Sequence, residues 1–166
     1  MADLSSKLEY PPLLGPGMHE MTLREVRQVC VDDFPLSTSR DDIMTQLEQM
    51  FDLFSQNGVA CCVWLDGSFM THKINPCDVD LVVCVPSDFA DNCNSEQLAV
   101  LGDVASNLKR SNKCTRCDTF LCMVPQDSDP MFLQWIDRLD YWKRWFGHSR
   151  TGVPKGIATV QVGDVT

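Results

Sequence analysis

Residues 64–85 read WLDGSFMTHKINPCDVDLVVCV and contain the strongest structural signal in the chain. An apolar run ends in Gly67-Ser68, a polar loop of nine residues follows, and Asp78-Val79-Asp80 then opens a second apolar run. The two apolar runs predict neighbouring strands. Because the side chains of a strand alternate between its faces, Asp78 and Asp80 point the same way, roughly 6.5–7 Å apart. We therefore expect a pair of carboxylates beside a tight turn.

This arrangement favours the binding of divalent metal and phosphate. Two carboxylates on one face can share divalent cations, and a Gly-Ser turn leaves backbone N–H groups and a hydroxyl beside them. Mg²⁺ prefers oxygen ligands and keeps several waters, so two or three carboxylates and substrate phosphates complete its shell. An Asp-x-Asp pair alone is more often a solvated strand start. The whole constellation, however, has the parts that are needed to hold a metal-bound triphosphate.

Gly67-Ser68, the nine-residue spacing and Asp78-x-Asp80 followed by Leu81-Val82-Val83 resemble the signature of the nucleotidyltransferase superfamily of the DNA polymerase beta type. The minimal nucleotidyltransferases of bacteria are especially similar. In that superfamily the Gly-Ser turn contacts phosphate, two acids bind magnesium, and a third acid comes from a later strand. Asp118 is the best match for the third acid, because its segment reads as a strand that follows a helix.

The resemblance implies a chemistry for these residues. Asp78 and Asp80 would hold two Mg²⁺ ions, and Asp118 would complete the metal site and help to deprotonate the acceptor. Gly67 and Ser68 would contact the phosphates of a nucleoside triphosphate. The reaction would move a nucleoside monophosphate to a hydroxyl of a protein or an RNA, such as a tRNA end.

Motifs nearer the ends of the chain extend the resemblance to an uncharacterised family of small nucleotidyltransferase-like proteins from bacteria and phages. These motifs are Pro16-Gly17-Met18-His19-Glu20, Thr22-Leu23-Arg24-Glu25-Val26 and Gly152-Val153-Pro154-Lys155-Gly156-Ile157. A role in toxin–antitoxin or phage-defence systems is what this resemblance implies. The alternative is a non-catalytic module that keeps the fold and acts through a protein partner.

Basic residues are needed to neutralise a triphosphate in a chain whose formal net charge is −9. Lys73 lies in the loop between the two halves of the motif, and Lys155 lies between a proline and a glycine. We expect both to contact phosphate, although each basic residue taken singly is more often a solvated surface charge. Asp66 precedes the glycine, and we assign it a structural role at the turn. Further basic residues lead into the Asp118 strand: Lys109, Arg110, Lys113 and Arg116.

Composition sets limits on the class of protein. The 166 residues suit one domain, and no apolar run is long enough for a membrane span. The acidic charge argues against general DNA binding, which depends on neutralising phosphates. Nine cysteines scattered through apolar segments favour a cytoplasmic protein with reduced thiols. Cys114-x-x-Cys117 is a lone pair, so we do not expect zinc.

Hydrophobic periodicity predicts the remaining elements. A capping-box pattern from Thr22 to Glu25 predicts a short helix to about Cys30, and apolar residues at helical spacing predict a helix at 40–56 that Gly58 ends. Residues 1–20 are expected to form an irregular arm before a single domain at 21–166. The other expected elements are strands at 59–65, 78–85, 116–124 and 156–162 (the last an edge strand), a polar loop at 86–94, and helices from 95 and at 131–146.

The order of these elements suits an α+β fold, in which helices pack on one face of a small mixed sheet. The superfamily resemblance implies the same, whereas periodicity alone leaves α/β and α+β open. The helix at 131–146 carries an aromatic cluster. A helix that covers the sheet explains such a cluster more simply than base stacking. Four aromatic residues within 141–146 cannot all face inward, however, so a homodimer or a partner surface also fits.

Overall fold

The computed structural model describes residues 7–163, which form a five-stranded mixed sheet with helices against it. The strand order is β1-β5-β2-β3-β4. The strands are β1 (Gly17–Glu20), β2 (Cys61–Asp66), β3 (Val79–Pro86), β4 (Cys117–Val124) and β5 (Gly156–Val162). The helices are α1 (Leu23–Arg27), the π-helical turn η2 (Gln28–Asp32), α2 (Arg40–Gln56), the 3₁₀ turn η3 (Ser68–Met70), α3 (Ser87–Asp91), α4 (Ser95–Ala105) and α5 (Phe132–Phe146).

The sheet combines antiparallel and parallel pairs. β2 lies antiparallel to both β3 and β5, whereas β3 pairs with β4, and β1 with β5, in parallel. The antiparallel pair β2–β3 needs only the loop at 67–78, while the parallel step from β3 to β4 needs a crossover that contains α3 and α4. This crossover brings the segment after α4 back to the start of β4.

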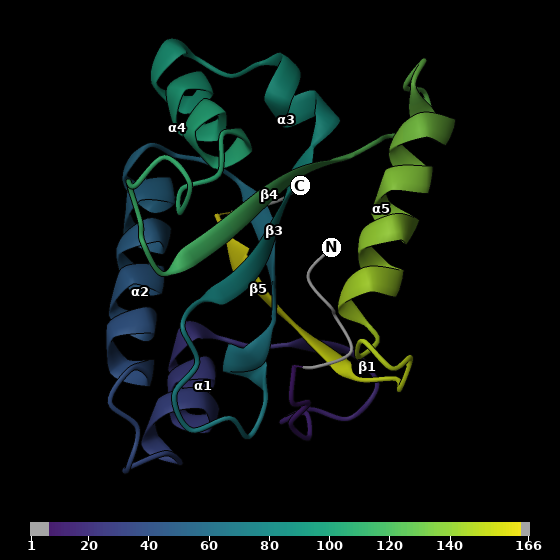
Figure 1. The fold of residues 1–166 in the computed structure, drawn as a ribbon. Coiled ribbons are helices and arrows are strands. Elements are labelled where there is room, and N and C mark those ends of the chain that lie inside the picture. Colours follow the sequence, from purple (N-terminus) through teal and green to yellow (C-terminus); the bar gives the residue numbers. More distant parts are fainter. Residues whose placement is uncertain (1–6, 164–166) are drawn as a thin grey trace.

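Helices cover both faces of the sheet (Figure 1). The larger core lies between the sheet and α1, α2 and α4, and the side chains of Leu47, Phe54 and Leu81 are fully buried there. A second, smaller core lies under α5, where Trp142 and Phe146 pack against Trp64 and neighbouring strand residues. Both cores are apolar because the central strands alternate between two buried faces.

The expectation that helices pack on one face is therefore wrong. The near-continuous apolar runs in β2 and β3 already point to two buried faces, because a strand with one solvated face would alternate apolar and polar residues. The expected α+β class is confirmed at the coarser level of a mixed sheet with helices.

The ends of the sheet also differ from expectation. β5 is not an edge strand, because β1 and β2 flank it. The outer strand β1 comes from residues that we assigned to the irregular arm, so the arm can include at most residues 1–16. Four residues are too few to show periodicity, and β1 depends on its pairing with β5. The close packing of Gly156 on this arm supports the pairing, since a Cβ at Gly156 would lie 2.3 Å from the carbonyl oxygen of Gly15.

Local signals set most helix boundaries. Thr22 and Glu25 form the reciprocal capping box at the start of α1. Helix α2 has the expected bounds, and Gly58 follows its end with a φ of 65°. The polar loop expected at 86–94 contains the short helix α3. Leu98, an apolar residue of α4, is 55% exposed.

Candidate functional site

Three aspartates lie side by side at one end of β2, β3 and β4, and together with Asp78 they form what we call the acid row. Asp80 on β3 is the register partner of Asp66 on β2 and of Asp118 on β4. Residues that pair directly across neighbouring strands share a face, so the three side chains project together. Asp78 precedes β3 by one residue and, by alternation, projects to the same face as Asp80. Four carboxylates therefore gather on the side of the sheet that α5 covers.

Within this row the ionised form is least favourable at Asp80. Burial, followed by the charges of Asp78, Asp118 and Asp66, raises the pKa of Asp80 to about 7, and Lys109 only partly offsets them. A carboxyl among several others is costly to ionise unless a cation neutralises it. The positive charge of Lys109 therefore lowers the cost of ionising Asp80 but does not remove it.

The turn after β2 places bare backbone against this carboxylate. Gly67 has a φ of 81°, a conformation that side-chain-bearing residues avoid. A Cβ at Gly67 would lie 1.9 Å from Oδ2 of Asp80, so no side chain fits while Asp80 stays in place. Ser68 follows and begins η3. The expected approach of the Gly-Ser turn to the aspartates is thus a feature of the fold.

The segment that follows α4 partners two of the acids. Nζ of Lys109 donates to Oδ2 of Asp78. Asn107 is buried, and its Nδ2 donates to Oδ1 of Asp118 at 2.5 Å. The Oδ1 atom of Asn107 accepts from the backbone N–H groups of Lys109 and Arg110, at 3.1 and 3.2 Å. One asparagine thus joins the third acid to the basic turn.

Lys155 is placed on Asp66. Its Nζ lies 2.7 Å from Oδ1 of Asp66 and donates to Oδ2 at 2.9 Å. The side chains are only 14% and 7% exposed, so the pair is buried. Burial nevertheless raises the pKa of Asp66 to about 6, against the opposing effect of Lys155. Asp66 is therefore more than a turn residue, because it adds a fourth acid to the row and draws Lys155 to it.

The loop between the two halves of the motif is fixed by a fully buried arginine. Arg40, the first residue of α2, donates five hydrogen bonds to backbone carbonyl groups and has no carboxylate partner within residues 7–163. Its guanidinium also lies over the ring of Phe34, 3.7 Å from the centroid. The acceptors are the carbonyl oxygens of Cys30, Phe69, Thr71 and Lys73, at 2.5–3.2 Å. Arg40 thus fixes the path of the chain from Gly67 toward Asp78.

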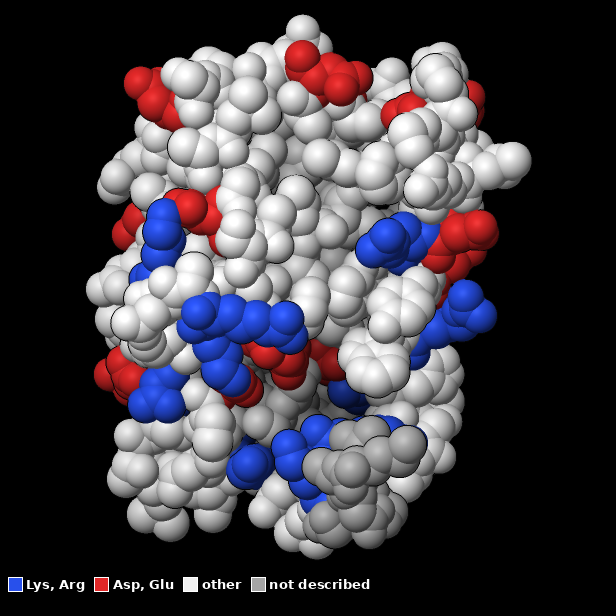
Figure 2. All heavy atoms as spheres, turned by 45° about the horizontal axis from the view of Figure 1, so that its top comes forward, with Lys and Arg blue, Asp and Glu red and all other residues white. Residues whose placement is uncertain are grey.

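The other side chains considered for phosphate binding are not hydrogen-bonded to the acid row within residues 7–163. The side chains of Ser68 and Lys73 make no hydrogen bond to any of the acids in the part of the chain that the structure describes. Lys113 pairs with Asp103, and Arg116 pairs with Asp42. On the face drawn in Figure 2, Lys and Arg side chains gather around and partly cover acidic atoms near its centre.

Sequence reasoning missed Asn107 and Arg40. Asn107 follows Ser106, the residue that caps the end of α4, and its φ of 68° is the left-handed conformation in which glycine or asparagine commonly ends a helix. An asparagine after a predicted helix was therefore an available signal. Arg40 gave no comparable signal, since an arginine at the start of a helix is normally solvated.

The oxygen-rich donor set fits Mg²⁺ better than a softer metal, because hard cations prefer carboxylates. Among residues 7–163, no three acidic, thiol or imidazole groups stand ready as a preformed metal cluster. Lys109 and Asn107 each bind an oxygen atom of one of the acids. Asp78, Asp80 and Asp118 are the residues of the acid row that could hold such an ion.

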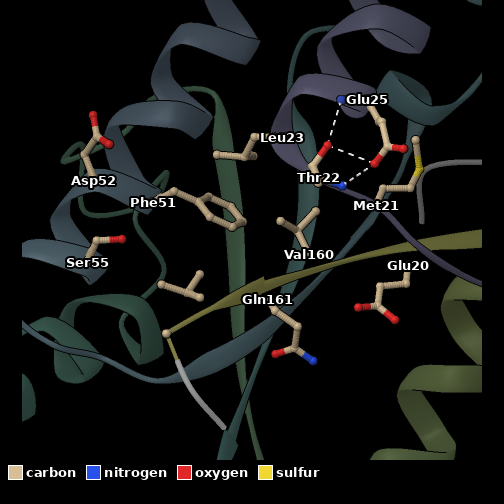
Figure 3. A pocket seen from close by; sticks show the side chains of 12 residues that line it. Glu20, Met21, Thr22, Leu23, Glu25, Phe51, Asp52, Ser55, Val160 and Gln161 are labelled. Carbon is tan, nitrogen blue, oxygen red and sulfur yellow. Dashed lines mark hydrogen bonds between the residues drawn. The ribbon is translucent and has the colours of Figure 1, made fainter.

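A separate pocket lies on the other side of the sheet, between the start of α1, the end of α2 and β5. It has a volume of about 640 Å³ and combines apolar walls with acidic groups at its rim. Figure 3 shows Leu23, Phe51 and Val160 around it and the capping hydrogen bonds of Thr22 and Glu25 beside it. None of the four aspartates of the row lines this pocket.

Helix α5 divides its aromatic residues between the sheet and solvent. Trp142 and Phe146 are buried, whereas Tyr141 and Trp145 are 48% and 65% exposed and stack on each other. The prediction that part of the cluster is exposed is confirmed. No helix within the described residues is long and apolar enough to cross a membrane.

No curated protein and no solved structure matches the chain. One family model matches residues 7–161, which include every strand but the last residue of β5 and all four aspartates of the row. That match covers most of the chain, and the protein therefore belongs to a family of unknown function (DUF6932).

Proposed function

We propose that this protein is a magnesium-dependent nucleotidyltransferase, which moves a nucleoside monophosphate from a nucleoside triphosphate to a hydroxyl of a protein or an RNA. The observation that carries the proposal is the register of Asp80 with Asp118, with Asp78 on the same face and the Gly67 backbone against Asp80. Carboxylates on two neighbouring strands beside an open turn suit a metal-bound triphosphate.

Each residue has a defined task in this proposal. Asp78 and Asp80 hold the metal, and bound Mg²⁺ would neutralise charge on the leaving pyrophosphate and favour loss of the acceptor proton. Asp118 completes the site and accepts that proton. The backbone at Gly67 and Ser68 donates N–H groups to the phosphates. Lys73 and Lys155 are the expected phosphate contacts, and Lys155 has to leave Asp66 to make one.

A second candidate is a non-catalytic module that acts through a protein partner. The stacked pair Tyr141 and Trp145 favours it, because exposed aromatic residues are enriched at protein interfaces. Lys109 and Asn107 also neutralise or bind two of the acids without any metal. A role in toxin–antitoxin or phage-defence systems, and a homodimer, agree with either candidate.

Calorimetric titration with each of the four nucleoside triphosphates in the presence of Mg²⁺ tests the proposal. We expect at least one triphosphate to bind in a magnesium-dependent manner, and the double variant Asp78→Asn/Asp80→Asn to lose that binding. The matched control is Asp127→Asn/Asp129→Asn, which changes an Asp-x-Asp pair of the same spacing in the turn after β4. The control should bind as the wild type does.

The failure of this test is also informative. If a folded wild-type protein binds none of the triphosphates, the catalytic proposal is wrong and the binding module becomes the better account. If the control variant loses binding together with the double variant, the effect is one of net charge and not of this site.

A further inference from the structure

Lys109 donates a hydrogen bond to Oδ2 of Asp78, which is one of the carboxylates proposed to bind the metal. This oxygen cannot bind a metal ion while the lysine is bound to it. Lys109 reaches Asp78 across 31 positions of sequence, from the turn after α4 to the start of β3. The ammonium group of Lys109 therefore partly neutralises the acid row at Asp78.

The turn at 107–110 holds the backbone of Lys109 close to Asp78. Asn107 has a left-handed backbone conformation. Its side-chain Nδ2 donates to Asp118, and its Oδ1 accepts from the backbone N–H groups of Lys109 and Arg110. The same segment is tied to β4 a second time, because the backbone N–H of Leu108 donates to Oγ1 of Thr119 at 3.0 Å. The turn is therefore anchored on β4, and the lysine stem projects from a fixed base.

The pair is nevertheless able to open. The Lys109 side chain is 40% exposed and that of Asp78 is 19% exposed. Partly exposed ion pairs contribute little free energy, so the lysine can leave without unfolding the turn. The pair of Lys155 and Asp66 is more buried, with side chains that are 14% and 7% exposed, and it therefore opens less readily.

We propose that Lys109 is the resident counter-ion of the acid row, that a divalent cation takes its place, and that the displaced ammonium group then binds the triphosphate. The proposal rests on the proposed function, because it assumes that Asp78 and Asp80 receive the metal. It predicts two effects of opposite sign for one substitution. Loss of the lysine removes a competitor of the metal, but it also removes a ligand of the phosphates.

The test measures binding and does not require turnover. Mn²⁺ alone is titrated into the wild type, Lys109→Met and Lys113→Met, with free Mn²⁺ followed by electron paramagnetic resonance. Inorganic triphosphate is then titrated by calorimetry at saturating Mn²⁺. Methionine keeps most of the apolar stem, and Lys113 is the matched control because it pairs with Asp103 in the same segment.

We expect Lys109→Met to bind Mn²⁺ about tenfold more tightly and inorganic triphosphate about tenfold more weakly, since one competing positive charge is lost from the first site and one attractive charge from the second. Lys113→Met should match the wild type in both titrations. Asn107→Gly keeps the left-handed backbone conformation accessible and removes the side-chain hydrogen bonds to Asp118, Lys109 and Arg110. It should shift the Mn²⁺ affinity in the same direction as Lys109→Met, by a smaller factor.

The outcomes separate this inference from the proposed function. If the wild type binds Mn²⁺ through Asp80, as shown by loss of binding in Asp80→Asn, and Lys109→Met binds it equally or more weakly, the inference is overturned and the proposed function stands. If neither the wild type nor Lys109→Met binds Mn²⁺, both are overturned. A structural role of Lys109 alone would weaken both titrations together, which is a different pattern from the expected one.

Discussion

At the scale of single residues, the candidate site depends on the absence of a side chain at Gly67. The position has a φ of 81°, and a Cβ there would meet Oδ2 of Asp80 at 1.9 Å. The Asp80 carboxylate is the end of a side chain, so it can rotate away from an added methyl group. A substitution at Gly67 therefore disturbs the acids more than it disturbs the core.

We expect Gly67→Ala to abolish Mn²⁺ binding while the protein still folds, because the methyl group displaces the Asp80 carboxylate. At φ 81° and ψ −166° the backbone lies in a region that essentially only glycine occupies, so an alanine there should also lower the free energy of unfolding by about 1–3 kcal/mol. Chemical denaturation and Mn²⁺ titration measure the two effects separately.

Gly102→Ala is the matched control for Gly67→Ala. Gly102 lies in α4 with open space around its Cβ position, so this change should leave metal binding intact and raise stability by about 0.5–1 kcal/mol. Retention of metal binding by Gly67→Ala would mean that the Asp80 carboxylate is not a ligand.

At the scale of elements, the sequence patterns and the structure agree where the signal is local. Helix α2 has the predicted bounds because its apolar residues repeat at helical spacing and glycine follows its end. The alternation of side chains along a strand predicted that Asp78 and Asp80 share one face. The prediction of a strand after a helix located Asp118, which lies in β4. The register of Asp80 with Asp118 needs the parallel pairing of β3 and β4, which no local pattern specifies.

Features that depend on contacts between distant segments were not predictable. β1 exists because it pairs with β5, and α5 covers the second face because the crossovers leave that face open. Asn107 and Lys109 become part of the site only when the turn after α4 docks on β3 and β4. Tertiary placement therefore decides which polar side chains accompany the aspartates.

Arg40 links two elements, since it connects the first turn of α2 to the loop that leads to Asp78. We expect Arg40→Met to lower the free energy of unfolding by about 2–4 kcal/mol, because it leaves several buried carbonyl groups without donors. Arg40→Lys should recover only part of the loss, as an ammonium group cannot reproduce the guanidinium fork. Urea denaturation measures all three proteins.

The exposed residue Arg24 offers a matched control, and Arg24→Met should change stability by less than about 0.5 kcal/mol. If Arg40→Met were as stable as the wild type, the carbonyl groups of the loop would have to find other donors. Hydrogen exchange of the amides at 69–76 would then show whether the loop keeps its structure.

At the scale of the whole molecule, negative charge is concentrated at a partly buried site. The chain has a formal net charge of −9, and the carboxylates of the row lie partly buried at one end of β2, β3 and β4. Lys109 and Lys155 offset part of this charge, but the pKa values of Asp80 and Asp66 remain raised, to about 7 and about 6. The metal-free fold is therefore strained electrostatically at neutral pH.

This strain gives a signed prediction for the dependence of stability on pH. Because the folded-state pKa of Asp80 and of Asp66 lies above the ordinary value of an aspartate, the folded protein binds more protons than the unfolded chain between about pH 4 and pH 7. The free energy of unfolding should thus rise as the pH falls from about 7 to about 5. Carboxyls with a lowered pKa, such as Glu25 and Asp42, oppose this only at lower pH.

Thermal denaturation in the absence of metal, compared between the wild type and Asp80→Asn, measures this effect. The variant should be more stable than the wild type at about pH 7.5, and its stability should depend less on pH between about 5 and 7, because the amide cannot ionise. Added Mg²⁺ should stabilise the wild type more at about pH 8 than at about pH 6, since a metal requires the deprotonated carboxylate. If the stability of the two proteins depended on pH in the same way, ionisation of Asp80 would not destabilise the fold. Charge repulsion at Asp80 would then not be a reason for metal binding at this site.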